Sequence, residues 1–257
     1  MKRIITYILF VFTLIVSLEA NAWGLLGHRV VGEVAIHHLN ESAKHKIKSI
    51  LGNQTLAEVS TWMDDIKSDS KYDSLKPWHY VTIPDGMRYS ETNKNPQGDV
   101  IAGINFVVDQ LKSDTIDPTR EKEYLMMLVH LVGDIHQPLH VGNGTDRGGN
   151  QVEVRWFGEK SNLHRVWDTQ MLDGKKYSYT ELTKIINHPE HEEIVSWQTD
   201  NVEDWAHQCM EFRDGIYTMA DGYSWAYKYQ YVHWDTMKKQ LLKGGVRLAG
   251  LLNDIYG

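Results

Sequence analysis

The chain has 257 residues, of which 42% are hydrophobic and 24% charged. This composition excludes a disordered, collagen-like or coiled-coil protein and predicts one domain with a well-buried core. Its 34 acidic and 27 basic side chains give a formal net charge of −7, which excludes nucleic-acid binding through a basic surface. The single cysteine, Cys209, cannot form an internal disulfide, whereas the 13 histidines favour a fold stabilised by metal.

The first 22 residues have the features of a cleaved signal peptide. Lys2 and Arg3 precede an apolar run over residues 4–18, and residues 20–22 (Ala-Asn-Ala) form the small-x-small pattern of a signal peptidase site. An apolar run of about fifteen residues is shorter than the roughly 20 that a membrane span requires, which disfavours a membrane anchor. We therefore expect an exported protein, periplasmic or secreted, whose mature domain of residues 23–257 begins at Trp23, has no membrane span and is monomeric.

Helical periodicity dominates the mature chain. Apolar residues recur at helical spacing over residues 24–51, which predicts one or two amphipathic helices, and a second such stripe covers residues 100–111. Residues 124–137 are apolar on most sides, which predicts a helix at the centre of the core. Pro138 cannot extend that helix, because it lacks an N–H and its ring clashes with the carbonyl four residues back.

The part of the chain after Pro138 contains the strand signal. Residues 142–150 are polar and glycine-rich, which predicts a loop, and residues 152–156 then alternate with a period of two, which predicts a small hairpin. Helical patterns return over residues 179–186, 192–212 and 224–255. The sequence therefore predicts a mainly α, single-domain helical bundle with one small β-hairpin.

Ligand-type residues recur at a spacing of four in three pairs: His130 with Asp134, His136 with His140, and His164 with Asp168. Residues i and i+4 share a helix face, so each pair can point at one centre. A single pair of this kind is more often a surface hydrogen bond. His130 and Asp134, however, lie in the most apolar helix, where an unpaired carboxylate costs several kcal/mol.

The charge of Asp134 needs a cationic partner. No lysine or arginine lies between residues 123 and 147, so the partner comes from elsewhere in the fold or is a metal ion. Histidine and carboxylate ligands in a roughly tetrahedral arrangement suit zinc. Asp64 and His79 each lie beside bulky aromatic residues; either alone is consistent with a packed, satisfied polar group, but as members of a set they indicate a metal centre.

The order and spacing of these motifs resemble a known family, the zinc-dependent single-strand-specific nucleases and 3′-nucleotidases of fungi, plants and bacteria called the S-one/P-one type. The resemblance covers the whole mature chain and is carried by Trp23-Gly24 with His28, Trp62-Met63-Asp64, Trp78-His79-Tyr80, residues 130–140 (HLVGDIHQPLH), residues 146–150 (DRGGN) and residues 162–168 (NLHRVWD). It identifies the chain as an exported bacterial member with the helical fold that these nucleases share with zinc phospholipases C.

The resemblance implies three zinc ions. The first would be bound by Asp64, His79, His130 and Asp134; the second by His140, His164 and Asp168; the third by His28, by Asp134 as a bridge, and by the free amine and carbonyl of Trp23. Cleavage after Ala22 creates that amine, and an α-amine of pKa about 8 loses its proton readily to a metal. The uncleaved precursor should therefore lack this site.

The same resemblance implies the chemistry. Three zinc ions place local positive charge inside an acidic protein, where a water between two ions bridged by Asp134 ionises and attacks phosphorus in line. The third ion stabilises the leaving 3′ oxygen. Single-stranded DNA, RNA and 3′-nucleotides are the expected substrates, and the cut strands carry 5′-phosphates.

Two further residues, Lys67 and Tyr80, match substrate-contacting positions of the family, and Asn150 at the end of the glycine loop is a third candidate. Lys67 lies one helical turn after Asp64 and would stabilise the transition-state charge on the phosphate, the alternative being a surface lysine. Tyr80 would stack on a base, the alternative being a core tyrosine, and Asn150 would touch the substrate. Thr82 stands where fungal members have an aspartate, which leaves the base preference open.

The other histidines have weaker assignments. His136 lies within the shared motif and would support a metal ligand through a hydrogen bond. Solvated or helix-capping positions are expected for His37, His38, His45, His188, His191, His207 and His233.

Two other functions fit parts of the pattern. A zinc phospholipase C would share the fold, but its last ligand pair would end in glutamate rather than Asp168, and its first histidine would lie farther from the mature N-terminus than His28 lies from Trp23. A zinc-storage protein would carry histidine-rich tracts, whereas these ligand-type residues are dispersed from Trp23 to Asp168. Both differences favour the nuclease.

Overall fold

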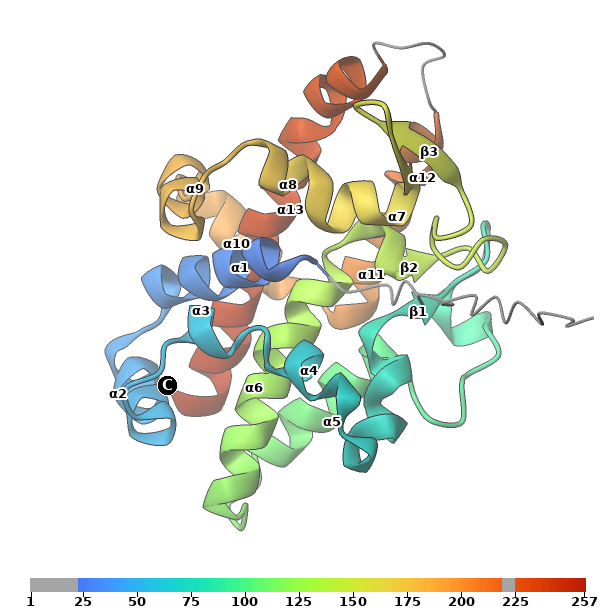
Figure 1. Cartoon of the computed structure of the whole chain (residues 1–257). Helices are drawn as coiled ribbons and strands as arrows, with labels where there is room; N and C mark the ends of the chain where they lie inside the picture. The colour runs from blue at the N-terminus through green and yellow to red at the C-terminus, as the bar shows by residue number, and fades with distance from the viewer. Residues whose placement is uncertain (1–22, 219–224) are drawn as a thin grey trace, which may run out of the picture.

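The computed structural model describes residues 23–218 and 225–257, so the expected signal peptide lies outside the described residues. The described chain forms one mainly helical domain with two very small sheets, as Figure 1 shows. Within the described ranges, no helix combines the length and the apolarity that a bilayer span demands.

The first half of the chain is built from short and medium helices. They are α1 (Leu25–His38), α2 (Glu41–Leu51), α3 (Leu56–Val59), α4 (Trp62–Asp65), α5 (Val100–Leu111) and α6 (Pro118–Ile135), with 3-10 helices η1 (Ile66–Ser68), η2 (Ser70–His79) and η3 (Tyr89–Glu91). Residues 24–51 thus form two helices, because the Asn40 side chain accepts a hydrogen bond from Ala43 N and starts α2. The predicted helix over residues 100–111 coincides with α5.

The second half ends in the longest helix of the described chain. Its elements are η4 (Pro138–His140), α7 (Leu163–Arg165), the π-helix η5 (Val166–Gln170), α8 (Met171–Gly174), α9 (Tyr179–Ile186), α10 (His191–Thr199), α11 (Val202–Met210), α12 (Arg213–Tyr217) and α13 (Trp225–Tyr256). Residues 192–212 divide into α10 and α11 because Asn201 caps a new helix at Asp204 N. Ser224, the first residue of the last predicted helix, lies outside the described residues.

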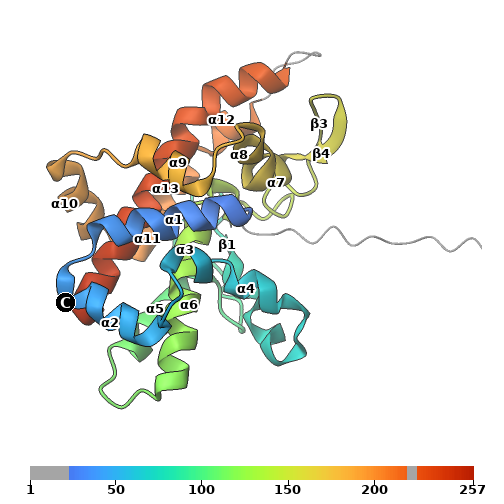
Figure 2. The same cartoon turned by 60° about the vertical axis from the view of Figure 1, so that its left-hand side comes forward.

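Helix α6 passes through the centre of the domain, and α1, α5 and α13 pack against it (Figures 1 and 2). It begins at Pro118, before the predicted residue 124, because Asp117 caps its first turn and proline is well tolerated there. This first turn is polar and therefore carries no hydrophobic signal. Residues 125–135 are all buried, and the helix ends before Pro138 as predicted.

The predicted hairpin is present. Strand β3 (Glu153–Trp156) pairs antiparallel with β4 (Glu159–Asn162), and Trp156 lies opposite Glu159. A second, unpredicted pair joins β1 (Val81–Thr82) and β2 (Val141–Gly142) in parallel, with Val81 opposite Val141. These two-residue strands are too short to show alternation. Their pairing brings the segment after His79 against the segment after His140.

Candidate metal centre

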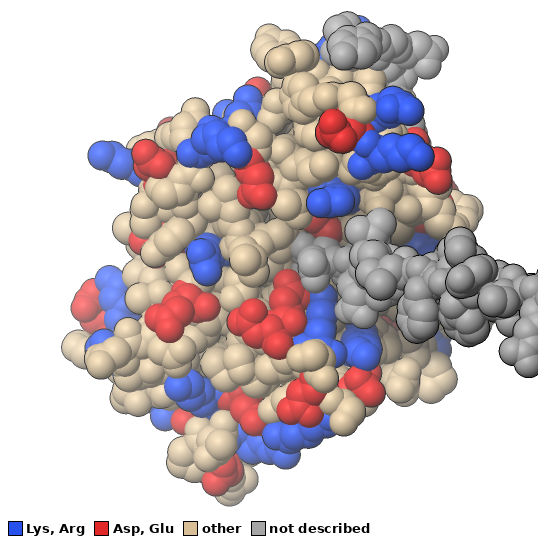
Figure 3. Space-filling model, viewed as in Figure 1, with Lys and Arg blue, Asp and Glu red and all other residues tan. Residues whose placement is uncertain are grey.

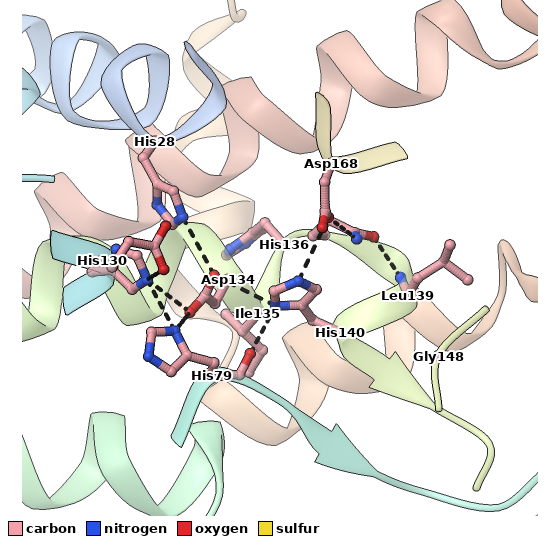
Figure 4. Close-up of polar contacts among 12 residues, drawn as sticks. His28, His79, His130, Asp134, Ile135, His136, Leu139, His140, Gly148 and Asp168 are labelled. Carbon is pink, nitrogen blue, oxygen red and sulfur yellow. Dashed lines mark hydrogen bonds and ion pairs between the residues drawn. The ribbon is translucent and has the colours of Figure 1, made fainter. Parts of the chain in front are cut away.

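Three clusters of histidine and carboxylate side chains converge in the interior of the domain. The groups are His28, His130 and Asp134; Asp64, His79 and His130; and His140, His164 and Asp168. In each group, one candidate ligand atom per residue lies within 4.8 Å of the others. Figure 4 shows side chains from α1, α6, η2, η4 and η5 pointing toward one another.

Asp134 lies at the middle of this arrangement. Its carboxylate is fully buried and lies 2.9 Å from His79 Nδ1, 3.2 Å from His130 Nε2 and 3.4 Å from His28 Nε2. Burial alone would raise the pKa of Asp134, but the charges of His130 and His140 outweigh it and hold the pKa well below its usual value. The carboxylate is therefore ionised and faces nitrogen donors from several elements.

Backbone carbonyls fix the orientation of three histidine rings. The Nδ1 atoms of His130, His140 and His164 lie 2.7 Å from the carbonyl oxygens of Ser60, His79 and Gly148, respectively. A carbonyl only accepts hydrogen bonds, so each Nδ1 carries a proton, and Nε2 is the nitrogen left to bind a metal once it is deprotonated. This arrangement is typical of histidines that bind a metal through Nε2.

Several buried polar atoms of the clusters have no hydrogen-bond partner. They include both ring nitrogens of His28, Nε2 of His140 and Oδ1 of Asp134. Burying such atoms without partners is costly. Cations placed among these lone pairs would satisfy them, and the mixed nitrogen and carboxylate donor set fits zinc. The residues present therefore fit metal ions.

His28 is held by close packing. Its ring stacks on His130 with centroids 3.9 Å apart and an interplanar angle of 14°. The facing residue on α6 is Gly133, where a Cβ atom would lie 2.6 Å from His28 Nδ1. Only glycine leaves room for the ring there.

Trp23 is anchored beside the clusters. Its side chain is fully buried in the core, and the next residue, Gly24, donates a hydrogen bond from N to the carbonyl oxygen of Asp168 at 2.6 Å. A side chain at Gly24 would contact Asp168 O and Thr169 Oγ1 at under 3 Å, so the two segments approach at backbone distance. The residue expected to be the mature N-terminus thus directly precedes a backbone contact with Asp168, a candidate metal ligand.

The π-helix η5 shapes the third cluster. A π-helical turn contains one more residue than an α-helical turn and is frequent at functional sites. This turn contains Asp168, whose Oδ2 lies 2.9 Å from His164 Nε2. Burial alone would raise the pKa of Asp168, but the neighbouring His164 and His140 rings lower it to about 2. Asp168 is therefore an anion at neutral pH.

The three predicted substrate-contacting residues lie in different surroundings. Lys67 Nζ lies 2.6 Å from Asp64 Oδ1 and its side chain is only 15% exposed, so it is not a free surface lysine. Tyr80 is 49% exposed, which excludes a core tyrosine. The Asn150 amide donates to Arg147 O at 2.9 Å, within the loop whose Gly148 carbonyl holds His164.

The expectation for His136 was wrong. Its Nδ1 donates to Val132 O at 2.7 Å, and its Nε2 accepts from Arg247 Nη1 at 3.0 Å, so neither ring nitrogen supports a metal ligand. His233 is buried against Tyr229 rather than solvated. Among the described residues, the other histidines with surface or capping assignments join no cluster.

Gln137 and Gly133 are site residues that the sequence interpretation missed. The Gln137 amide is fully buried and hydrogen-bonded to Asp168, although it follows His136 in the same motif. The available signal for Gln137 was an amide side chain between His136 and His140, two ligand-type residues of the same motif. The signal for Gly133 was a glycine inside the most apolar helix, which usually marks close packing.

The overall charge of the protein does not attract nucleic acid, since the formal net charge is −7. On the face shown in Figure 3, Lys and Arg side chains are interspersed with Asp and Glu side chains. Attraction of an anionic substrate would therefore depend on cations held within the clusters.

Comparison with known proteins matches residues 23–257 to the family described as S1/P1 Nuclease. The chain is 28% identical to Endonuclease 2 of Arabidopsis thaliana over 99% of this chain and 98% of that protein. It is 32% identical to Endonuclease 4 of the same plant, over 92% of this chain and 90% of the relative. Nuclease P1 of Penicillium citrinum is 27% identical over 91% of this chain and 98% of its own length.

Proposed function

Because the chain belongs to the S1/P1 nuclease family and is therefore a phosphodiester hydrolase, we propose that it is a three-zinc endonuclease of single-stranded DNA and RNA. Its products carry 5′-phosphates, and it also removes the phosphate of 3′-nucleotides. Export, cleavage after Ala22 and a monomeric state belong to the same proposal.

The position of Asp134 is the observation that carries the proposal. Its carboxylate lies within 3.4 Å of ring nitrogens of His28, His79, His130 and His140. These histidines belong to all three proposed sites, so one buried carboxylate links them. A carboxylate shared in this way would hold metal ions close together, which metal-assisted phosphate chemistry requires.

The residues divide into three proposed sites. The first comprises Asp64, His79, His130 and Asp134; the second His140, His164 and Asp168; the third His28, Asp134 and the amine and carbonyl of Trp23. When bound, zinc would supply positive charge for the phosphate and lower the pKa of an attacking water.

The protein's own side chains then act on the substrate. Lys67 is held at Asp64, where its ammonium group neutralises charge on the phosphate in the transition state. The half-exposed Tyr80 ring offers a stacking surface that every base can use, provided that the base is unpaired. Asn150, at the end of the glycine loop, would also touch the substrate. Preference for single strands follows from the stacking step.

The decisive experiment compares mature protein beginning at Trp23 with the same protein carrying one extra alanine before Trp23. The mature form should hold about three zinc ions and cleave single-stranded DNA, and the extended form should lose one ion and most activity, because its Trp23 nitrogen is an amide. Chelation followed by zinc addition serves as the activity control.

Two outcomes would contradict the proposal. Equal zinc content and activity in both forms would show that the amine of Trp23 is not a zinc ligand. A mature form that binds zinc but leaves DNA, RNA and 3′-nucleotides intact would refute the substrate assignment, and hydrolysis of phosphatidylcholine would then identify a phospholipase.

A further inference from the structure

Gln137 occupies an unusual place between two of the elements that build the centre. It directly precedes η4, which carries His140, and its side chain reaches η5, which carries Asp168. The residue is fully buried. Both ends of its amide are used: Oε1 accepts from Leu139 N at 2.6 Å, and Nε2 donates to Asp168 Oδ1.

The hydrogen bonds define the orientation of this amide. Leu139 N is a donor, so the amide atom facing it must be the oxygen, and the nitrogen must then face Asp168. An amide nitrogen has no lone pair for a metal, and the amide oxygen is occupied by the turn. Gln137 therefore acts on the centre only through Asp168.

The two carboxylate oxygens of Asp168 have different partners. Oδ1 receives the Gln137 amide and lies 3.6 Å from His140 Nε2, whereas Oδ2 lies 2.9 Å from His164 Nε2. The main chain of Asp168 is also held, because its carbonyl accepts from Gly24 N at 2.6 Å. The hydrogen bond from Gln137 thus restricts the rotation of the Asp168 carboxylate.

We infer that Gln137 is a positioning residue that holds Asp168 Oδ2 beside His164 for zinc at the site formed with His140. The inference rests on the proposed function, since it assumes that this cluster binds zinc. Hydrogen-bonded partners of metal ligands typically contribute about 10–100-fold to metal affinity, so loss of this contact should release one ion of the three.

Gln137→Asn is the most informative variant. An asparagine side chain accepts from the N–H two residues on, as Asn95 and Asn143 do in this chain at 3.0 Å, so the turn into η4 is preserved. The amide is one carbon shorter and no longer reaches Asp168. Gln137→Met, which keeps the length but has no amide, provides a second variant if the first does not fold.

Gln240→Asn is the matched control. Gln240 is 1% exposed, and its amide donates to His136 O and Cys209 Sγ, neither of which belongs to a candidate ligand. The zinc content of each protein is measured after dialysis against increasing concentrations of chelator, and folding is checked by circular dichroism. Gln137→Asn should lose one ion at about 10–100-fold lower chelator concentration than wild type, and Gln240→Asn should match wild type.

A double-mutant cycle with Asp168→Ala tests whether Gln137 affects zinc binding through Asp168. Asp168→Ala should release the same ion, and adding Gln137→Asn should cause no further loss. The inference is overturned if Gln137→Asn keeps all three ions with wild-type resistance, or if both glutamine variants lose zinc equally. Absence of zinc from wild-type protein would instead refute the proposed function.

Discussion

Replacing Gly133 with alanine tests how tightly His28 is held. A Cβ atom at position 133 would lie 2.6 Å from Nδ1 and 3.0 Å from Cε1 of His28. Ordinary contact begins at 3.4 Å, so the ring would have to move by roughly 0.8 Å. Because His28 is fully buried and stacked on His130, little space is available for this movement.

Two effects of Gly133→Ala oppose each other in the zinc-free protein. Alanine is favoured over glycine in a helix interior by about 1 kcal/mol, whereas overpacking costs about 1–3 kcal/mol. The variant should therefore lose up to about 2 kcal/mol of stability. A ring displacement of roughly 0.8 Å exceeds the ~0.5 Å that a functional site tolerates, so the site of His28 should lose its zinc.

The assay measures zinc per chain after gel filtration and denaturant unfolding after chelation. We expect zinc to fall from three ions to two in Gly133→Ala. The control is Gly215→Ala in α12, where the nearest atom to the added Cβ, His233 Cε1, is 3.9 Å away. The control should keep all its zinc and be equally or more stable. Three ions and full activity in Gly133→Ala would refute the close packing of His28 as a requirement for the site.

Three further predictions concern other parts of the chain. Tyr80→Ala should raise KM for single-stranded DNA by an amount equivalent to about 1–3 kcal/mol, whereas Tyr80→Phe should not; equal effects would argue against stacking. Burial raises the pKa of the Cys209 thiol to about 12, so at a pH of about 8 the thiol should react with a thiol reagent only after unfolding; rapid labelling of native protein would contradict this. Arg247→Met should cost about 3 kcal/mol of stability, because it removes the ion pair with Asp200 and the donor to His136, yet leave the zinc content unchanged. Loss of zinc in that variant would show that this network supports the site.

The sequence predicted the parts of the fold that depend on local patterns. The apolar character of residues 124–137 located the central helix, and Pro138 located its end. Helical spacing also brought His130 beside Asp134, and His164 beside Asp168. The roles of these residues as zinc ligands remain predictions, since spacing and convergence do not identify a bound ion.

Other features arise only from tertiary contacts. The β1–β2 pair is too short to leave a pattern, and it depends on segments about 60 residues apart. His136 and Gln137 are neighbours in one motif, but the first bonds to α13 through Arg247 and the second to Asp168. The chain path at the end of α6 and in the turn into η4 sets the direction in which each side chain points. The local sequence does not predict that path.

Backbone carbonyls accept the hydrogen bonds from Nδ1 of His130, His140 and His164, and this determines which substitutions the residues that carry those carbonyls tolerate. Every residue type carries a backbone carbonyl, so a substitution at Ser60 retains the acceptor for His130 as long as the chain path is kept. Gly148 is the exception, because its φ is +62° and a Cβ would lie 2.2 Å from Leu139 O. A small residue such as alanine should therefore be tolerated at the buried Ser60, whereas any side chain should be rejected at Gly148, although both residues contribute the same kind of hydrogen bond.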